Sequence, residues 1–372
     1  MSVTTKAALA VPGQDAYRIA DITVGEPQDH EVLVRVVAAG LCHTDALFKG
    51  AWQDPSLPPI VLGHEGAGVV EKVGALVTSV KPGDRVLMTF NSCGECDPCR
   101  TGHPAYCARF SDLNTSPTGS ARTDGTSGLT TTDGKPLAGG FFGQSSLAGY
   151  AIANDRNVVA VDADEDELAL LAPLGCGIQT GAGAILNELK PEPGSTVAVF
   201  GTGAVGMASV LAAGLTGASK IVAVDIVDSR LELARELGAT HTVNSATTDP
   251  VAALREISGG PGVQVAVETS GVPQVQVQAV DALATRGRLG LIGVRLDGHF
   301  DVLGTSLLRG ITVNGVIEGD SDIVTFLPAL VDYVRQGRFP LQRLIQEYPL
   351  KQIDQAAADS KSGRTIKPVI RF

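Results

Sequence analysis

The stretch 196–206, TVAVFGTGAVG, decides the fold of the second half of the chain. An apolar run is followed by a G-x-G-x-x-G turn that begins at Gly201, and the next apolar run, IVAVD, ends in Asp225. In a strand–turn–helix unit, such glycines let the backbone approach a pyrophosphate at the helix N-terminus, and an acid at this distance binds the adenosine ribose. The pattern predicts a dinucleotide site, and Asp225 favours NAD because it would repel the 2′-phosphate of NADP.

Further apolar runs follow at 263–268, 289–294 and 311–317, with helical patterns such as 229–239 between several of them. Continuous apolar strands that alternate with helices predict a parallel sheet covered on both faces. We therefore expect a doubly wound α/β domain over 177–317.

The block 1–176 has a different pattern. Short alternating or β-branched runs, such as 31–40 and 66–74, are separated by Gly, Pro and Asp, which is typical of a mostly antiparallel β domain. Within it, the polar stretch 111–140 predicts a long ordered excursion on the surface. The last block, 318–372, contains one amphipathic helix, and we expect it to return to the first domain.

The composition argues against several classes of function. A net charge of −11 disfavours nucleic acid and anionic membranes as partners. The chain has no run of eighteen apolar residues that would span a membrane, and its N-terminus lacks a signal-peptide pattern. We therefore expect a cytoplasmic protein, in which clustered cysteines bind metal instead of forming disulfides.

All six cysteines fall into two sets, of which the first is Cys93-x2-Cys96-x2-Cys99-x7-Cys107. Four thiolates at this spacing close a tetrahedral structural zinc site and fold a lobe around the metal. A zinc ribbon that binds nucleic acid is disfavoured because Arg100 is the only basic residue between these cysteines. Iron–sulfur ligation is the other alternative.

The second set is scattered and consists of Cys42, His64 with Glu65 beside it, and Cys176. Two thiolates and one imidazole leave a fourth position open, which is the ligand set of a catalytic zinc. Such a metal polarises a carbonyl oxygen or lowers the pKa of a bound alcohol, and NAD can then accept a hydride. We expect NAD and two Zn²⁺ per chain.

The same residues resemble the signature of the zinc-containing medium-chain alcohol dehydrogenases. The resemblance follows the whole chain in order and rests on Cys42-His43-Thr44-Asp45, Gly63-His64-Glu65, Gly68, Gly74, Val77, the four-cysteine lobe, Gly175-Cys176-Gly177 and the glycine-rich turn. It implies a GroES-like β catalytic domain joined to a Rossmann domain.

The resemblance also implies a role for each residue of the catalytic site. The scattered set would bind the catalytic zinc, and Glu65 would be an acid that approaches the metal transiently. Asp45 would orient His64, as acids behind metal ligands commonly do, and Thr44 would take the proton of the alcohol.

The implied cofactor-binding residues are His43, Thr180, Gly201, Gly203, Val205, Gly206, Asp225, Arg230 and Lys367. Thr180 and Val205 would contact the nicotinamide, and Lys367 a cofactor phosphate. Many members have arginine where this chain has His43, and many have histidine where it has Leu47. We therefore expect weaker binding of the pyrophosphate, faster NADH release, and a proton exit through His43 or directly to water.

Three runs resemble the aryl-alcohol (benzyl alcohol) dehydrogenases, namely 57–74, 141–146 and 315–320. The expected pocket residues are Phe142, Phe90 and Trp52. The expected reaction is the reversible oxidation of a bulky primary alcohol, such as benzyl, cinnamyl or geraniol, to the aldehyde.

Alternatives remain at this stage. A glutathione-dependent formaldehyde dehydrogenase would share the excursion at 111–140 and would use Arg109 and Arg122 for the glutathione carboxylates. A polyol dehydrogenase usually has glutamate in place of Cys176. A non-catalytic binding member of the superfamily would not need these intact ligands.

We expect a homodimer, or alternatively a homotetramer, joined by edge pairing near 311–317.

Overall fold

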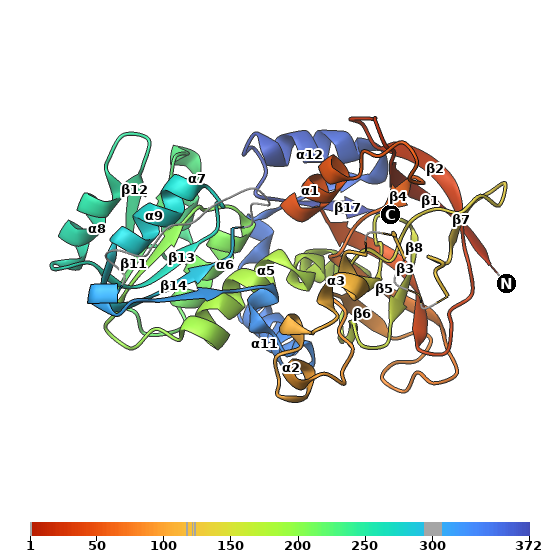
Figure 1. The fold of residues 1–372 in the computed structure, drawn as a ribbon, viewed down its shortest axis with the longest axis horizontal. Coiled ribbons are helices and arrows are strands. Elements are labelled where there is room, and N and C mark those ends of the chain that lie inside the picture. Colours follow the sequence, from red (N-terminus) through yellow and green to blue (C-terminus); the bar gives the residue numbers. More distant parts are fainter. Residues whose placement is uncertain (1, 117, 121, 123, 294–306) are drawn as a thin grey trace. The chain divides into compact units, whose positions relative to one another are not determined.

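The computed structural model describes residues 2–116, 118–120, 122, 124–293 and 307–372. The chain divides into two compact units (Figure 1). The first unit contains Met1–Cys176, Asp322–Gln336 and Leu341–Phe372, and the second contains Gly177–Ser321 and Gly337–Pro340. Within the described ranges, no single helix is both long and apolar enough to cross a bilayer.

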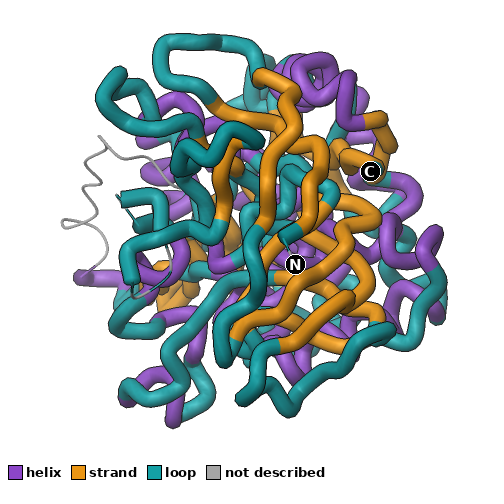
Figure 2. Tube along the Cα trace, turned by 90° about the vertical axis from the view of Figure 1, so that its right-hand side faces the viewer, coloured by secondary structure: helices purple, strands orange, loops and turns teal. Residues whose placement is uncertain are grey.

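A small antiparallel sheet forms one part of the first unit, and Figure 2 draws the strands of the chain in orange with the N-terminus toward the viewer. In sheet order these strands are β4 (Ile60–Val61), β1 (Val3–Ala10), β2 (Arg18–Val24) and β7 (Leu129–Thr131). The second half of β1, residues 7–10, is fully buried, whereas its first half alternates between exposed and half-buried positions. This sheet therefore packs inward only along part of its length.

A larger sheet forms the rest of the core of the first unit. Its order is β16 (Ile345–Pro349), β17 (Lys367–Arg371), β3 (Glu31–Gly40), β5 (Gly66–Val73), β6 (Arg85–Met88) and β9 (Val158–Ala160), and β8 (Tyr150–Asn154) also pairs with β3. All pairs are antiparallel except β16 with β17. Valines of β3, β5 and β6 supply much of its core, as the β-branched runs of the sequence predict.

Short helices connect these strands. They are α1 (His43–Ala51), α2 (Asp97–Arg100), η1 (Pro104–Tyr106), α3 (Phe110–Asn114), η2 (Phe141–Gly143), α4 (Glu165–Leu171), η3 (Ala172–Gly175), α11 (Ile323–Arg335), η6 (Leu341–Arg343), η7 (Leu350–Gln352) and α12 (Ile353–Lys361). The end of the chain therefore contributes α11, α12 and two strands to the first unit.

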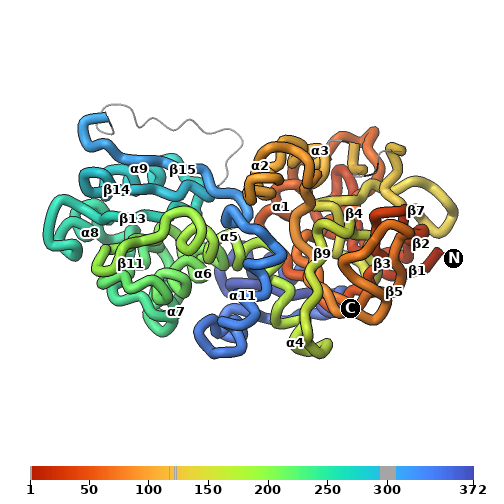
Figure 3. Tube along the Cα trace, turned by 90° about the horizontal axis from the view of Figure 1, so that it is seen from below, coloured from red at the N-terminus to blue at the C-terminus, as the bar shows by residue number. Residues whose placement is uncertain are grey.

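The second unit is built on a fully parallel sheet, and Figure 3 shows several of its strands in succession. In sheet order these are β12 (His241–Asn244), β11 (Lys220–Asp225), β10 (Thr196–Phe200), β13 (Val263–Glu268), β14 (Leu283–Leu291) and β15 (Thr312–Gly315). Its helices are α5 (Gly177–Gly183), the π-helical η4 (Ala184–Leu189), α6 (Ala204–Ala213), α7 (Asp228–Glu236), α8 (Pro250–Ser258), α9 (Pro273–Asp281) and η5 (Glu318–Asp320).

This arrangement confirms the predicted fold class. The apolar runs form strands because both faces of a parallel sheet are buried. Two details differ from the sequence prediction. The short, half-polar β12 has no apolar run to reveal it, and β14 begins at Leu283, before the predicted run at 289–294, of which residue 294 lies outside the described residues.

The polar excursion 111–140, apart from residues 117, 121 and 123, which lie outside the described set, is tied to the first unit by an ion pair. The Arg122 guanidinium donates to both carboxylate oxygens of Glu31 at the start of β3, with Nε–Oε1 and Nη2–Oε2 distances of 2.8 and 2.5 Å. The side chains of Arg122 and Glu31 are only 10% and 13% exposed. Such a bidentate, largely desolvated pair fixes geometry far better than an exposed one.

We expect Arg122→Met to destabilise the first unit by roughly 3 kcal/mol, because it leaves the Glu31 carboxylate largely buried without its cation. Lys6→Met is the matched control, since it removes an ion pair with Asp21 whose two side chains are 62% and 49% exposed, and it should cost less than about 1 kcal/mol. Urea unfolding followed by circular dichroism measures both. Equal losses in the two variants would contradict the anchoring role.

Candidate metal, cofactor and substrate sites

The scattered cysteine and histidine set comes together within the first unit. Cys42 precedes α1, His64 and Glu65 precede β5, and Cys176 follows η3. One ligand atom from each of the four lies within 4.8 Å of the others. His64 has no exposed surface, and its Nε2 has no hydrogen-bond partner among the described residues. A buried imidazole nitrogen that faces two thiols is the donor arrangement that zinc requires.

Asp45 joins two of the segments that carry these groups. One carboxylate oxygen accepts the Cys42 backbone N–H at 2.9 Å. The other accepts the Gly63 N–H at 2.9 Å and lies 3.2 Å from His64 Nδ1. Because Nδ1 contacts the carboxylate, Nε2 is the nitrogen that faces the thiols. Thr44, half-buried in the first turn of α1, has its hydroxyl 3.8 Å from the sulfur of Cys42.

The electrostatics of this site follow from burial. The hydrogen bond to Cys176 is the main reason that the pKa of the Cys42 thiol is lowered, with the Lys367 charge adding to it. Burial raises the pKa of Glu65 to about 7, and the Lys367 ammonium opposes that rise. A lowered thiol pKa favours the thiolate, which is the form that binds metal.

Lys367 lies in the interior of the first unit, beside Glu65. Its ammonium is 2% exposed and pairs with the Glu65 carboxylate at 2.6 Å. The family resemblance predicted a contact between this lysine and a cofactor phosphate, whereas within the first unit its ammonium balances a buried acid. Lys367 begins β17, and β17 pairs with β3 beside Gly40, so the sheet itself carries the lysine into the interior.

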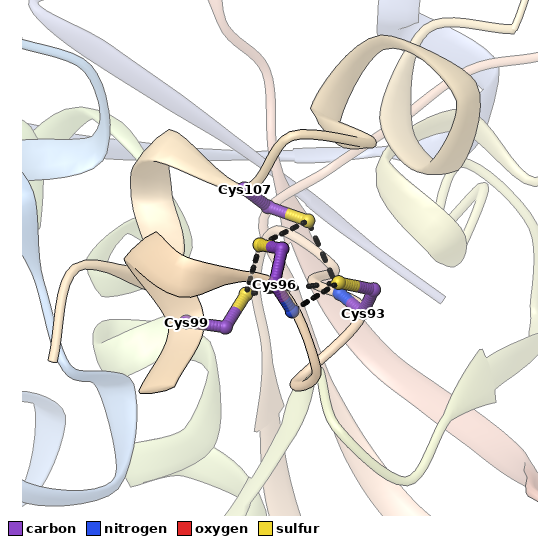
Figure 4. Close-up of side chains that lie close together, drawn as sticks. All are labelled: Cys93, Cys96, Cys99 and Cys107. Atoms are coloured by element: carbon purple, nitrogen blue, oxygen red, sulfur yellow. Dashed lines mark hydrogen bonds between the residues drawn. The ribbon is translucent and has the colours of Figure 1, made fainter. Parts of the chain in front are cut away.

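The other four cysteines form the lobe shown in Figure 4. Their sulfurs are 3.4 to 4.0 Å apart in the contacts Cys96–Cys99, Cys93–Cys99 and Cys96–Cys107. A tetrahedral site with Zn–S bonds of about 2.3 Å has sulfur–sulfur edges of about 3.8 Å. The spacing therefore fits one zinc ion.

Backbone N–H groups also point at these sulfurs. Cys93 N–H donates to Cys107 Sγ at 3.2 Å, and Ala108 N–H donates to Cys96 Sγ at 3.4 Å. Backbone hydrogen bonds lower the pKa of Cys96 to about 6, and the bond from the Ala108 N–H has the largest effect. Donors directed at sulfur thus favour the thiolate form of Cys96, whereas burial raises the pKa of Cys99 and Cys107.

The glycine-rich turn of the second unit connects β10 to α6. Gly201 has φ of +85°, and a side chain at Gly206 would meet Gly201 O at 1.9 Å. The turn therefore needs glycine at both positions, and Gly203 is the N-cap of α6. This geometry leaves the helix N-terminus open to a phosphate group.

Asp225 ends β11 beside this turn. One carboxylate oxygen accepts from the N–H and hydroxyl of Thr202, both at 2.7 Å, and the other accepts from the N–H groups of Ile226 and Val227 at 2.8 and 3.0 Å. These four donors hold the carboxylate in one orientation and occupy its roughly four acceptor sites, so a ribose hydroxyl would have to share an oxygen with one of them.

The other predicted cofactor residues lie on helices, three in the second unit and one in the first. Thr180 is buried in α5, and Val205 is half-buried in α6, where the two helices pack closely around Gly181. Arg230 is half-buried in α7, and its Nε has no hydrogen-bond partner among the described residues. His43, the first residue of α1, is exposed in the first unit.

An apolar pocket of about 300 Å³ lies in the first unit. Its lining residues are Phe48, Ala51, Trp52, Leu57, Ile60, Leu62, Asn114, Thr115, Ser116, Gly119, Gly139, Gly140 and Phe141. Of the three expected pocket residues, Trp52 is in the lining, and its indole N–H donates to Pro58 O at 2.9 Å. Phe90 and Phe142 are buried at 1% and 5% exposure and do not line this pocket.

Phe141, which was not among the predicted pocket residues, links the pocket to the candidate metal site. Its ring lines the pocket and contacts the His64 ring edge-on, with centroids 5.4 Å apart. Phe142 lies against the same imidazole at 4.6 Å. The pair Phe141–Phe142 was the available signal, but sequence alone could not say which ring faces the pocket.

Comparisons with known proteins agree with this geometry. Residues 28–163 match the family described as alcohol dehydrogenase GroES-like domain, and residues 204–332 match the family described as zinc-binding dehydrogenase. A geraniol dehydrogenase from Castellaniella defragrans is 41% identical over 94% of this chain and 93% of its own length.

Two solved structures superpose along the whole chain. An alcohol dehydrogenase zinc-binding domain protein from Burkholderia ambifaria has a TM-score of 0.95 and 49% identity, with full coverage of both chains. The benzyl alcohol dehydrogenase from Acinetobacter calcoaceticus has a TM-score of 0.92 and 43% identity, covering 100% of this chain and 99% of that one. Fold, cysteine sets and whole-length similarity together establish that the chain belongs to the zinc-dependent medium-chain alcohol dehydrogenase family.

Proposed function

We propose that this chain oxidises a bulky primary alcohol reversibly to the aldehyde, with NAD as hydride acceptor. The observation that carries the proposal is the position of Phe141, which contacts the candidate ligand His64 and lines the apolar pocket. An aromatic or allylic group in that pocket would keep its alcohol carbon close to the metal site. The similarity to a geraniol and a benzyl alcohol dehydrogenase supports the same substrate class.

In this proposal Cys42, His64 and Cys176 hold the catalytic zinc, which when bound acts as a Lewis acid toward the substrate oxygen. Asp45 keeps the His64 imidazole in the tautomer that presents Nε2. The Thr44 hydroxyl, near Cys42, is placed to accept the proton of the alcohol. Glu65 stays behind the ligands, with its charge balanced by Lys367.

For the cofactor, we propose that Asp225 accepts the ribose hydroxyls of NAD and that the N-terminus of α6 binds the pyrophosphate. The carboxylate is already held by four donors, so it cannot swing away to admit a 2′-phosphate without losing them. Selectivity for NAD over NADP follows from that rigidity.

The ion pair between Arg122 and Glu31 weakens the alternative of a glutathione-dependent enzyme. Arg122, one of its two candidate anion-binding residues, is already paired with Glu31 and is largely buried. Arg109 is exposed, and one isolated cation is a weak basis for binding the two carboxylates of glutathione. A non-catalytic role is disfavoured because a buried His64 Nε2 without a metal would be a costly unsatisfied group.

The substrate class is tested by initial rates of NADH formation with benzyl alcohol, geraniol, ethanol, and formaldehyde with glutathione. We expect benzyl alcohol or geraniol to exceed ethanol in kcat/KM by at least about 100-fold, since burying a ring or allylic chain is worth about 3 kcal/mol. If the glutathione adduct were the best substrate, the proposal would be wrong.

Trp52→Ala should lower kcat/KM for the bulky alcohols about tenfold and leave kcat/KM for ethanol unchanged. Phe90→Leu, a buried residue outside the pocket lining, is the control and should leave these ratios unchanged.

We also propose that the four-cysteine lobe holds a second, structural zinc. Cys107→Ser should remove one zinc per chain, measured by atomic emission, and should expose Arg100 and Arg109 to trypsin because the lobe folds around the metal. Glu95→Gln, an exposed change inside the same lobe, should do neither. Unchanged zinc content in the serine variant would exclude this site as a ligand set.

For the assembly, we propose a homodimer that forms along β15. This strand ends the described sheet, and just before it Leu307 and Leu308 are 84% and 89% exposed. Arg309 fixes this segment by donating to the carbonyl oxygens of Val280 and Leu283 at 3.1 and 2.8 Å. Leucines presented in this way beside a strand edge fit a second copy.

We therefore expect Leu308→Asp to convert the dimer to monomer in sedimentation experiments, because it places a charge in an apolar contact. Val324→Asp, at a 69% exposed position on α11, should leave the dimer intact. A Leu308→Asp variant that sediments like the wild type would place the interface elsewhere.

A further inference from the structure

Gln144 is a buried side chain to which neither the sequence pattern nor the reaction assigns a role. It is 1% exposed, and its amide makes three hydrogen bonds to backbone. Oε1 accepts from Gly66 N–H at 3.1 Å, and Nε2 donates to His64 O and Thr89 O, both at 2.9 Å. The partners define the amide orientation, because an N–H can only donate and carbonyl oxygens can only accept. Both donor hydrogens of Gln144 are therefore used.

These bonds bracket the segment that carries the candidate metal ligand His64. Two of them are made to the peptide groups on either side of Glu65, at His64 O and Gly66 N. A side chain at Gly66 would lie 3.0 Å from Gln144 Oε1 and 2.6 Å from Ser146 Cβ, so glycine is what allows the amide to approach. Gln144 is thus one of the buried groups that hold the backbone of His64, and it acts together with Asp45, which binds the N–H of Gly63.

Thr89, which directly follows β6, extends the same network to the segment that carries Cys176. Its carbonyl oxygen accepts from Gln144, and its hydroxyl donates to Gly175 O at 2.5 Å, directly before Cys176. A side chain at Gly175 would meet Met88 O at 2.4 Å, which shows how closely this segment approaches the strand. One chain of side-chain bonds therefore runs from His64 through Gln144 and Thr89 to Gly175.

The backbone around Gln144 is held in an uncommon conformation. Gly140, Phe142, Gly143 and Ser145 all have positive φ, at 70°, 51°, 65° and 57°. For the two residues that are not glycine this conformation costs roughly 1 kcal/mol or more each. The Ser145 hydroxyl holds the turn, donating to Val61 O at 2.6 Å and accepting from Phe141 N–H at 3.0 Å. Strain of this kind persists only where surrounding contacts over-determine it.

We propose that Gln144 and Thr89 are positioning residues that set the spacing between the metal ligands His64 and Cys176. This inference rests on the ligand set proposed above. Neither side chain touches the metal position directly. Each acts on the backbone next to a ligand, through hydrogen bonds that lie in the buried interior of the first unit.

The expected consequence concerns how firmly the metal is held. Residues behind metal ligands typically contribute about 10–100-fold to metal affinity. Gln144→Met keeps the length and volume of the side chain but removes all three hydrogen bonds, so it should speed zinc release from this site about 10–100-fold. Thr89→Val should speed zinc release about tenfold. Thr89→Ser keeps the hydroxyl and should therefore release zinc at the wild-type rate.

Zinc release from purified holoenzyme to a chromogenic chelator measures these rates. Cys176→Ser identifies the phase that belongs to this site, because the four-cysteine lobe remains intact in it. A second readout is the visible spectrum of cobalt-substituted enzyme, whose bands depend on ligand geometry and should shift in Gln144→Met. Tyr348→Phe is the matched control: it removes a buried hydroxyl that bonds to Asp359 and Thr365 in the same unit, and it should alter neither readout.

The outcomes separate the two proposals. Wild-type release rates and spectra in both Gln144→Met and Thr89→Val would overturn the positioning role while leaving the ligand set intact. Equal effects from Tyr348→Phe would also overturn it, since general destabilisation would then explain the change. If Cys176→Ser removed no phase at all, the ligand set itself would be wrong. Failure of Thr89→Ser to restore the rate would show that the hydroxyl does not act as described.

Discussion

The buried carboxylate of Asp45 is the interaction on which the first unit's candidate metal site depends. It is fully shielded from solvent, and it holds the segment of Cys42 through one oxygen and the segment of His64 through the other. These segments lie some twenty residues apart in the chain, so nothing local keeps them together. A charge placed in the interior is tolerated only when its acceptor capacity is used, and here the backbone supplies the donors.

A second buried charge pair supports the same site from the opposite end of the sequence. Lys367 enters through β17 and neutralises Glu65, which burial alone would drive toward its protonated form. Lys367 thus opposes the rise in the pKa of Glu65 that burial causes, beside two thiols that must be anionic to bind metal. Removing either member would leave the other charge buried and alone, which is more costly than lacking both.

The turn at 140–145 shows how backbone strain and function coincide in this protein. Its positive φ values bring Phe141 and Phe142 to the imidazole of His64 and the amide of Gln144 to the backbone around it. The same six residues thus contribute to the lining of the apolar pocket and to the hydrogen bonds around the candidate ligand His64. A relaxed turn would separate these tasks, and that offers a physical reason why the strained conformation is retained.

Sequence alone determined the features that depend on local spacing. The glycine turn with the acid that ends the next strand, and the four cysteines with their x2, x2, x7 spacing, each lie within a short length of chain. Pattern therefore predicted that each group would come together, as the structure shows. The alternation of apolar runs and helices likewise predicted the parallel sheet, because burial on both faces imposes that composition.

Only the tertiary structure decided the contacts between residues that lie far apart in the sequence. It paired Lys367 with Glu65, committed Arg122 to Glu31, turned Phe141 and not Phe142 toward the pocket, and brought Gln144 to the backbone of His64. The reason is that a side chain's partner across the fold is set by register and packing, which leave no periodic trace in the chain.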